Sequence, residues 1–442
     1  MTGKLSPLRE FVKDGVVLVV EPSPGFSSIY QTVLQTMGLP IEQVVVLRKF
    51  SEALKFVIEK KPRLIVTEYE IETSFGLDLL EEQEKQYEAL DRISLITTKN
   101  SSDAAVAEAA EGQVDGYLLK PFPGNSFQKK LVEILEQKIK PSAYHQKLAV
   151  GRKLFSSRDF DHAVAEFRDS KPMHSKPSLA CYHAGVSYQA KGELSKAVAE
   201  FKEGQNYQPL HYKCLLAEFE TLLAQSNYPE AYKLTATIRE NYPVTSKRLG
   251  QIFVAAVFTS HFEELPTLYE MFARLDQRSP ELIHISSTAL LTAGKFLIKQ
   301  NSLEKSQDYF NLGLLISNRQ FDYIEKIVNE YIRIAAPDMA LNFLANVKNS
   351  DMGTPAHQRL SLRVEQLRLP PTEWAEKARK LILAGNADSE ISQKVVQVLA
   401  RQGQQAHIQL ILDKVSKEDP ALHSILEKMS KDYSPREAKS GV

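Results

Sequence analysis

Short apolar runs alternate with amphipathic stretches in the first 139 residues. The apolar runs lie at 16–20, 43–47, 64–67, 93–97 and 115–119. Residues with helical periodicity fill the intervals, near 26–37, 51–59, 76–86, 102–110 and 125–138. Apolar strands that alternate with helices are typical of a parallel sheet covered on both faces. The pattern therefore predicts a doubly wound α/β domain at residues 14–139, with a five-stranded parallel sheet.

The pattern changes near Pro141, after which strand signals disappear and helical periodicity continues to about residue 430. The string FDHAVAEF at 160–167 returns as LSKAVAEF at 194–201, 34 residues later. Small, aromatic and proline residues make up the signature of this repeat. They are Gly151, Gly185, Ala163, Ala197, Ala231, Phe167, Phe201, Tyr188, Pro209 and Pro243. The small residues let paired helices approach to about 8–10 Å, and the phenylalanine fills the joint with the next repeat.

This period and pattern resemble tetratricopeptide repeats. The resemblance implies an all-α superhelical solenoid over residues 140–430, with regular repeats at about 144–245 and degenerate helix pairs after them. The register slips around 246–286, where we expect lengthened helices or an irregular turn. The polar residues 431–442 are predicted to form a disordered tail.

Composition narrows the classes of function. The 442 residues include 55 basic and 55 acidic ones, and this zero net charge argues against nucleic acid as a partner. No apolar run approaches the roughly 20 residues of a membrane span, and the N-terminus lacks the apolar stretch of a signal peptide. We therefore expect a cytoplasmic protein. Cys181 and Cys214 are too few for a disulfide framework or a four-ligand zinc site, and we expect both to be buried.

Polar residues stand where the strands of the predicted sheet end. Glu21 follows the first strand, Glu68 the third, Thr98 the fourth and Lys120 the fifth. The carboxyl ends of parallel strands meet at one edge of an open sheet, where binding sites form. With the strings GLDLL (76–80) and DGYLLKPF (115–122), this constellation resembles the receiver domain of two-component response regulators.

The resemblance implies a phosphorylation pocket whose chemistry is altered. The family phosphorylates an aspartate at the end of the third strand, and an acidic pair after the first strand helps to hold Mg²⁺. Here Glu68 replaces the aspartate and Glu21–Pro22 replaces the acidic pair. Mg²⁺ needs oxygen ligands in octahedral geometry at about 2.0–2.1 Å, and Pro22 offers no side-chain oxygen. A misplacement of about 1 Å costs on the order of a hundredfold in rate.

The residues that sense the phosphoryl group in the family are retained. By resemblance, Thr98 and Lys120 would bind its oxygens, and Tyr117 would be the aromatic switch that turns inward. Two roles for Glu68 remain open. Its carboxylate imitates a bound phosphoryl group in part, since phosphate carries about −1.5 to −2 charge, or it forms a structural ion pair with Lys120.

We expect no cofactor and no Mg²⁺; Glu21 and Glu68 are the only metal ligands that the pocket pattern offers. The solenoid predicts a concave groove for a protein partner, with Arg152 and Tyr182 as candidate lining residues. For Tyr182, burial in the core of its helix pair is the alternative. The receiver-like domain could also form a homodimer, as in its family. The linker near 137–144 is short, so we expect the two domains to pack together.

No nucleophile–base pair or phosphate-binding loop is present in the sequence, and the pattern therefore predicts a protein that is not an enzyme. The function predicted best is a signalling adaptor or scaffold in a two-component-like pathway, bacterial by resemblance alone. Two alternatives stay open: a response regulator that is phosphorylated, and a regulatory or inhibitory subunit of a partner enzyme.

Overall fold

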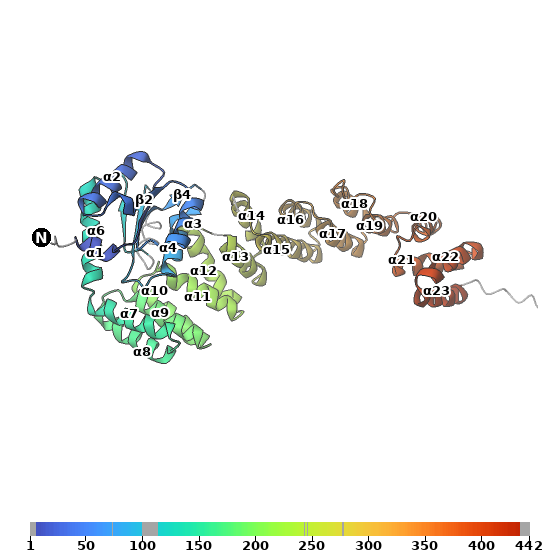
Figure 1. Cartoon of the computed structure of the whole chain (residues 1–442). Coiled ribbons are helices and arrows are strands. Elements are labelled where there is room, and N and C mark those ends of the chain that lie inside the picture. Colours follow the sequence, from blue (N-terminus) through green and yellow to red (C-terminus); the bar gives the residue numbers. More distant parts are fainter. Residues whose placement is uncertain are drawn as a thin grey trace, which may run out of the picture. The chain divides into compact units, whose positions relative to one another are not determined.

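The computed structural model describes residues 6–72, 74–99, 114–242, 244, 246–275 and 278–433 (Figure 1). The chain divides into two compact units, Met1–Ser260 and His261–Val442. The first unit holds the sheet and the first repeat helices, and the second holds the later helices. The division falls inside the stretch where the sequence register slips.

The apolar runs form one parallel sheet with the strand order β2–β1–β3–β6–β7. The strands are β1 Val17–Val20, β2 Val44–Leu47, β3 Leu64–Glu68, β6 Ile93–Thr98 and β7 Gly116–Leu119. Every residue of β1 and β6 is buried, because helices cover both faces of the sheet. The predicted five-stranded sheet is confirmed.

Two helical layers enclose this sheet (Figure 1). One face packs against α1 Pro7–Val12, α2 Pro24–Thr36 and α6 Gly124–Ile139. The other face packs against α3 Phe50–Lys60 and α4 Gly76–Glu84. A short 3₁₀ helix, η1 Ile41–Gln43, leads into β2, and the two-residue strands β4 Glu70–Ile71 and β5 Ser74–Phe75 connect β3 to α4. The helix predicted near 102–110 lies outside the described residues.

The repeat helices of the first unit follow in antiparallel pairs. They are α7 Ala143–Ser156, α8 Phe160–Ser170, η2 Lys171–Met173, α9 Ser178–Ala190, α10 Leu194–Tyr207, α11 Tyr212–Ala224, α12 Tyr228–Asn241 and α13 Ser246–Phe258. The signature alanines are fully buried between paired helices. Tyr188 is buried as well, Pro209 follows the end of α10, and Pro243 lies outside the described residues.

Glycine at the repeat position is required by close packing. A Cβ on Gly151 would stand 2.5 Å from a ring carbon of Phe167, and one on Gly185 would stand 2.3 Å from a ring carbon of Phe201. The same pairing returns in the second unit, where a Cβ on Gly294 would meet the Phe310 ring at 2.2 Å. The 34-residue spacing therefore places one phenylalanine ring over one glycine in each of these helix pairs.

The second unit consists of helices that bury two apolar clusters. They are η3 Phe262–Glu264, α14 Leu265–Arg274, α15 Pro280–Lys299, α16 Leu303–Ile316, α17 Phe321–Arg333, α18 Pro337–Leu344, α19 Pro355–Glu365, α20 Pro371–Leu383, α21 Ser389–Arg401, α22 Gln405–Glu418 and α23 Pro420–Tyr433. Helix α15 has 20 residues and begins in the stretch where the register slips, but most of it lies after residue 286. No helix among the described residues is long and apolar enough to cross a membrane.

The start of the predicted tail is wrong by three residues. Helix α23 continues to Tyr433, whereas disorder was predicted from residue 431. Ser430 is buried, and Lys431 pairs with Glu427 one turn earlier at 2.8 Å, so the last turn keeps packing and charge partners. Residues 434–442 lie outside the described part of the chain.

Candidate functional site

The carboxyl edge of the sheet brings three of the four predicted pocket residues into direct contact. The Nζ atom of Lys120, which follows β7, lies 2.5 Å from Oε2 of Glu21 and 3.2 Å from Oε1 of Glu68. The side chains of Lys120 and Glu21 are each 1% exposed and that of Glu68 is 12% exposed. One buried ammonium group is therefore shared by two carboxylates.

The fourth residue, Thr98, ends β6 beside this cluster. Its side chain is buried, and its carbonyl oxygen accepts a hydrogen bond of 2.8 Å from the amide of Lys120. The Lys120–Pro121 peptide bond is cis. Tyr117 lies two strand positions before Leu119 and packs, half-buried, on the apolar cluster under α3 and α4. The structure thus places Thr98 and Lys120 together, whereas Tyr117, which the resemblance predicts to be a switch, lies on the opposite face from α2.

Helix α2 supplies two aromatic partners that sequence analysis missed. The Tyr30 hydroxyl donates to Oε2 of Glu21 at 3.5 Å, and Lys120 Nζ lies 4.6 Å from the centre of the Phe26 ring. The amide of Ser23 donates to the other oxygen of Glu21 at 3.0 Å. Burial, with the charges of Glu21 and Glu68, raises the pKa of Tyr30, so its hydroxyl stays protonated and remains a donor.

The residues at this edge do not fit the magnesium ion that the fold implies. Each carboxylate places one oxygen against the Lys120 ammonium, whose positive charge would repel a second cation bound beside it. Pro22 contributes no side-chain oxygen to replace them. A hard divalent cation needs a set of oxygen ligands free of a competing positive charge. The two carboxylates here are instead already engaged by an ammonium group of the protein.

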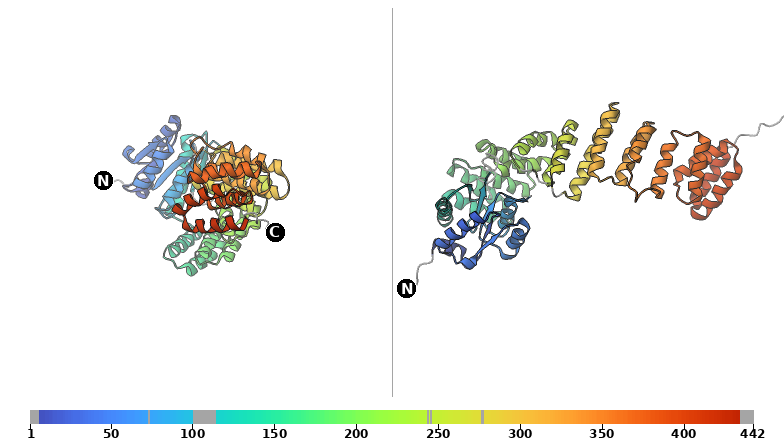
Figure 2. Two further views of the ribbon diagram at one scale, coloured as in Figure 1. Left: turned by 90° about the vertical axis from the view of Figure 1, so that its right-hand side faces the viewer. Right: turned by 90° about the horizontal axis from the view of Figure 1, so that it is seen from above.

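The two residues predicted to line the repeat groove lie against the sheet domain of the same chain. Arg152 on α7 has its Nε atom 3.8 Å from Oε2 of Glu88, in the loop between α4 and β6. Tyr182 on α9 lines a cavity of about 360 Å³ whose other wall is α4. Figure 2 shows the helices of the first unit beside the sheet domain. The expected packing of the two domains is present within this unit.

One ion pair fastens α4 to the repeats. Lys213 on α11 places its Nζ atom 3.2 Å from Oε1 of Glu84, the last residue of α4. The Lys213 side chain is 10% exposed, and burial lowers the pKa of its amine while Glu84 opposes this shift. Lys213 Nζ also lies 5.5 Å from the centre of the Tyr182 ring. Sequence analysis gave no signal for this pair.

A buried polar network supports Glu84 from the sheet side. Arg92 Nη2 lies 3.2 Å from Glu84 Oε1, and Arg92 Nη1 donates to the hydroxyl of Ser94. The Ser94 hydroxyl donates to Gln83 at 2.7 Å, and its amide donates to Asp115 at 2.8 Å. This network fixes the end of α4 and the amino ends of β6 and β7, which form the side of the domain that faces the repeats.

The response regulator receiver domain model matches residues 17–132. This match and the five-stranded sheet show that the chain carries a receiver domain, with helical repeats after it. Receiver domains and tetratricopeptide-like repeats serve signalling and protein interaction, and neither is typically catalytic. No curated protein sequence matches the chain significantly.

Solved structures similar to the chain include a tetratricopeptide repeat protein from Parabacteroides merdae, with 12% identity, a TM-score of 0.32, and coverage of 57% of this chain and 97% of that one. The Naa15/Naa10 complex bound to HypK-THB has 13% identity, a TM-score of 0.45, and coverage of 69% and 47%. Yeast Tom70 has 13% identity, a TM-score of 0.25, and coverage of 66% and 67%. Our assignment of the repeats rests on the glycine–phenylalanine pairs.

Proposed function

We propose that the protein is a non-enzymatic signalling adaptor whose receiver domain does not accept a phosphoryl group and whose repeats bind a partner protein. The observation that supports this most is the Lys120 ammonium shared by Glu21 and Glu68. In a competent pocket the lysine meets the phosphoryl oxygens and the carboxylates hold Mg²⁺. Here each of these groups already has its partner, in a buried site.

Phosphoryl transfer would require breaking both ion pairs inside a buried pocket. The Lys120–Glu21 pair is fully buried, and separating a buried pair is costly unless the incoming group compensates both charges. The longer Glu68 side chain also moves the acceptor oxygen by roughly one carbon–carbon bond, and about 1 Å of misplacement costs on the order of a hundredfold in rate. The two penalties act on the same step. The pocket therefore holds one signalling state rather than switching between two.

The pocket is tested by incubating the full chain with acetyl phosphate and Mg²⁺ and measuring its intact mass. We expect no added phosphoryl group on the wild type. The matched variant Pro22→Asp/Glu68→Asp restores the two acidic residues of the receiver pattern, and we expect it to gain one phosphoryl group. A phosphorylated wild-type protein would overturn the proposal in favour of a response regulator.

Partner binding is tested by affinity capture with the full chain, with and without acetyl phosphate. We expect the wild type to recover the same partners under both conditions, because its pocket does not respond. Recovery that changes with acetyl phosphate in the wild type would contradict the adaptor proposal. If the partner is an enzyme whose activity falls when the full chain is added, the regulatory-subunit alternative applies instead.

A further inference from the structure

We propose that the surface formed by the repeat helices α9, α11 and α13 binds an acidic amphipathic helix of a partner protein, and that α4 covers this surface until such a helix displaces it. The inference deepens the proposed function and rests on it, since it names the chemistry of the partner. Three acidic residues of α4, Asp78, Glu81 and Glu84, form what we call the acidic stripe. Lys213, Lys247 and Arg248 form the basic wall.

Helix α4 presents two faces with different chemistry. Leu79, Leu80 and Gln83 are fully buried and pack toward the sheet. Successive members of the acidic stripe are three residues apart and are therefore neighbours on the helix surface. All three line the cavity with Phe75 and Leu77. An aromatic residue, a leucine and three acids are therefore turned toward the repeats.

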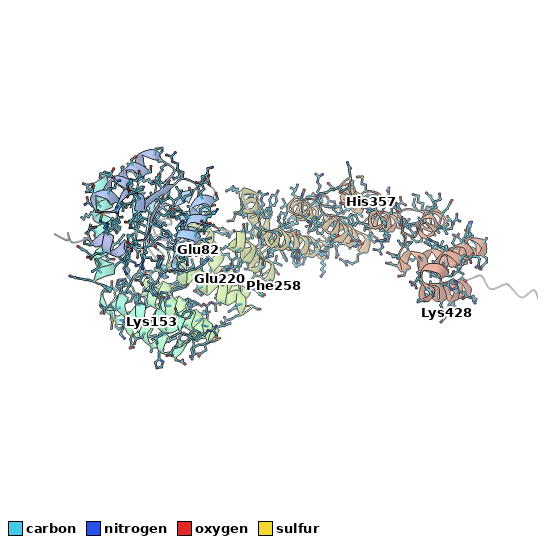
Figure 3. The ribbon with its side chains drawn as sticks, in the orientation of Figure 1. Glu82, Lys153, Glu220, Phe258, His357 and Lys428 are labelled. Atoms are coloured by element: carbon cyan, nitrogen blue, oxygen red, sulfur yellow. The ribbon has the colours of Figure 1, made fainter. Side chains whose placement is uncertain are left out.

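The basic wall comes from two successive first helices of the repeats. Lys213 lies on α11, and Lys247 and Arg248 lie on α13. Arg248 rests on Tyr212, with a hydrogen bond of 2.7 Å to its hydroxyl and 5.3 Å to the ring centre. Lys247 pairs with Glu220, labelled in Figure 3, at 3.1 Å. Lys213 and Arg248 are thus the cations presented to the acidic stripe.

The acidic stripe of α4 and the basic wall of the repeats are only partly paired. Lys213 forms an ion pair with Glu84, whereas Asp78 and Glu81 remain exposed at the cavity. The cavity of about 360 Å³ lies between α4 and the repeat helices. The space is large enough for water, so α4 and the repeat helices do not contact each other across it. A helix that carries the same residues and also fills this space would make contacts with the repeats that α4 does not make.

Helix α4 can leave the repeats without leaving the receiver domain, because its other face is packed in the receiver core. Its sheet-facing residues remain packed when the repeats are released, because they belong to the receiver core. Opening therefore exposes the groove without unfolding the receiver domain. A competing acidic helix shifts the population toward the open form by binding that form alone.

The test uses a fluorescent peptide of residues 75–86, stapled between positions 79 and 83, which face the sheet in the protein. Its binding to the full chain is measured by anisotropy for the wild type and for Glu84→Gln, Lys213→Gln and Glu82→Gln. Glu82, labelled in Figure 3, lies on α4 but does not line the cavity. A control peptide, neutral along the acidic stripe, carries the substitutions Asp78→Asn, Glu81→Gln and Glu84→Gln.

The two partners of one ion pair are expected to give opposite results. Glu84→Gln loosens α4 and leaves the basic wall intact, so peptide affinity rises by up to about fivefold, as expected for a partly exposed pair. Lys213→Gln also loosens α4, although Arg92 still pairs with Glu84, and it removes a cation from the basic wall, so affinity falls below that of the wild type. Glu82→Gln matches the wild type, and the neutral peptide binds none of the four proteins.

Equal peptide binding by the Glu84→Gln and Lys213→Gln proteins, or binding of the neutral peptide, would overturn the inference. If the acidic peptide fails on all four proteins while the wild type still resists phosphorylation and captures a partner, this inference alone is lost. Phosphorylation of the wild type would instead overturn the proposed function.

Discussion

Substitutions of Lys120 and Glu68 are predicted to reduce the stability of the first unit by unequal amounts. Lys120→Met keeps much of the side-chain volume but strands two carboxylates, one 1% and one 12% exposed. Removing one partner of a buried ion pair costs about 3–5 kcal/mol, and the loss of the shared lysine leaves both carboxylates uncompensated. We expect the free energy of unfolding of the first unit to fall by about 4 kcal/mol, which is on the order of 10 °C in melting temperature.

Glu68→Gln is the matched control, because it leaves the contact of 2.5 Å between Lys120 and Glu21 in place. Its expected cost is about 1 kcal/mol or less, as for a partly solvated pair. Urea unfolding is followed by hydrogen exchange of the strand amides. The fluorescence of Trp374, the only tryptophan, reports separately on the second unit, where its indole donates to the Leu362 carbonyl at 2.9 Å. Equal destabilisation by the two substitutions would refute a shared lysine.

Two further predictions concern the repeats. Gly185→Ala places a Cβ 2.3 Å from the Phe201 ring and should destabilise the first unit by about 1–3 kcal/mol in urea unfolding. The control Gly25→Ala, whose Cβ would meet open space, should leave the stability unchanged. Equal effects of the two substitutions would contradict the packing argument. Burial lowers the pKa of His211 to about 3. Below about pH 6.5 the unfolded chain therefore binds a proton at this residue that the folded chain does not bind. The free energy of unfolding falls as the pH drops from 6.5 toward 3, by at most about 1.4 kcal/mol per pH unit. His211→Asn keeps an acceptor for the Cys214 amide, which now donates to the ring at 3.2 Å, and should flatten this slope between pH 7 and pH 4.5; an unchanged slope would assign the pH dependence to other groups.

The sheet could be predicted from the sequence because its buried strands are short apolar runs that leave a local pattern. The repeats were predictable for a similar reason, since the Gly185–Phe201 contact recurs at a fixed spacing. Glu21, Glu68 and Lys120 were predicted together because parallel strands end at one edge. Each of these signals comes from position along regular elements.

The contacts that were missed join residues without such a pattern. Tyr30 and Phe26 have the same apolar appearance as core residues of α2, and only the fold turns them toward the pocket. Glu84 and Lys213 are 129 residues apart and each resembles a solvated surface charge. Arg152 and Tyr182 were predicted to line the repeat groove, and the sequence could not show that both lie against the receiver domain of the same chain.

The most direct test of the closed pocket is the addition of beryllofluoride and Mg²⁺, which together imitate an aspartyl phosphate, with hydrogen exchange measured over β3 and β6 in the full chain. Our account predicts that exchange at residues 64–68 and 93–98 of the wild type is unchanged, and that the Pro22→Asp/Glu68→Asp protein becomes protected there. Protection of these strand ends in the wild type would show that Lys120 releases its two carboxylates to a phosphoryl group, and would contradict the account.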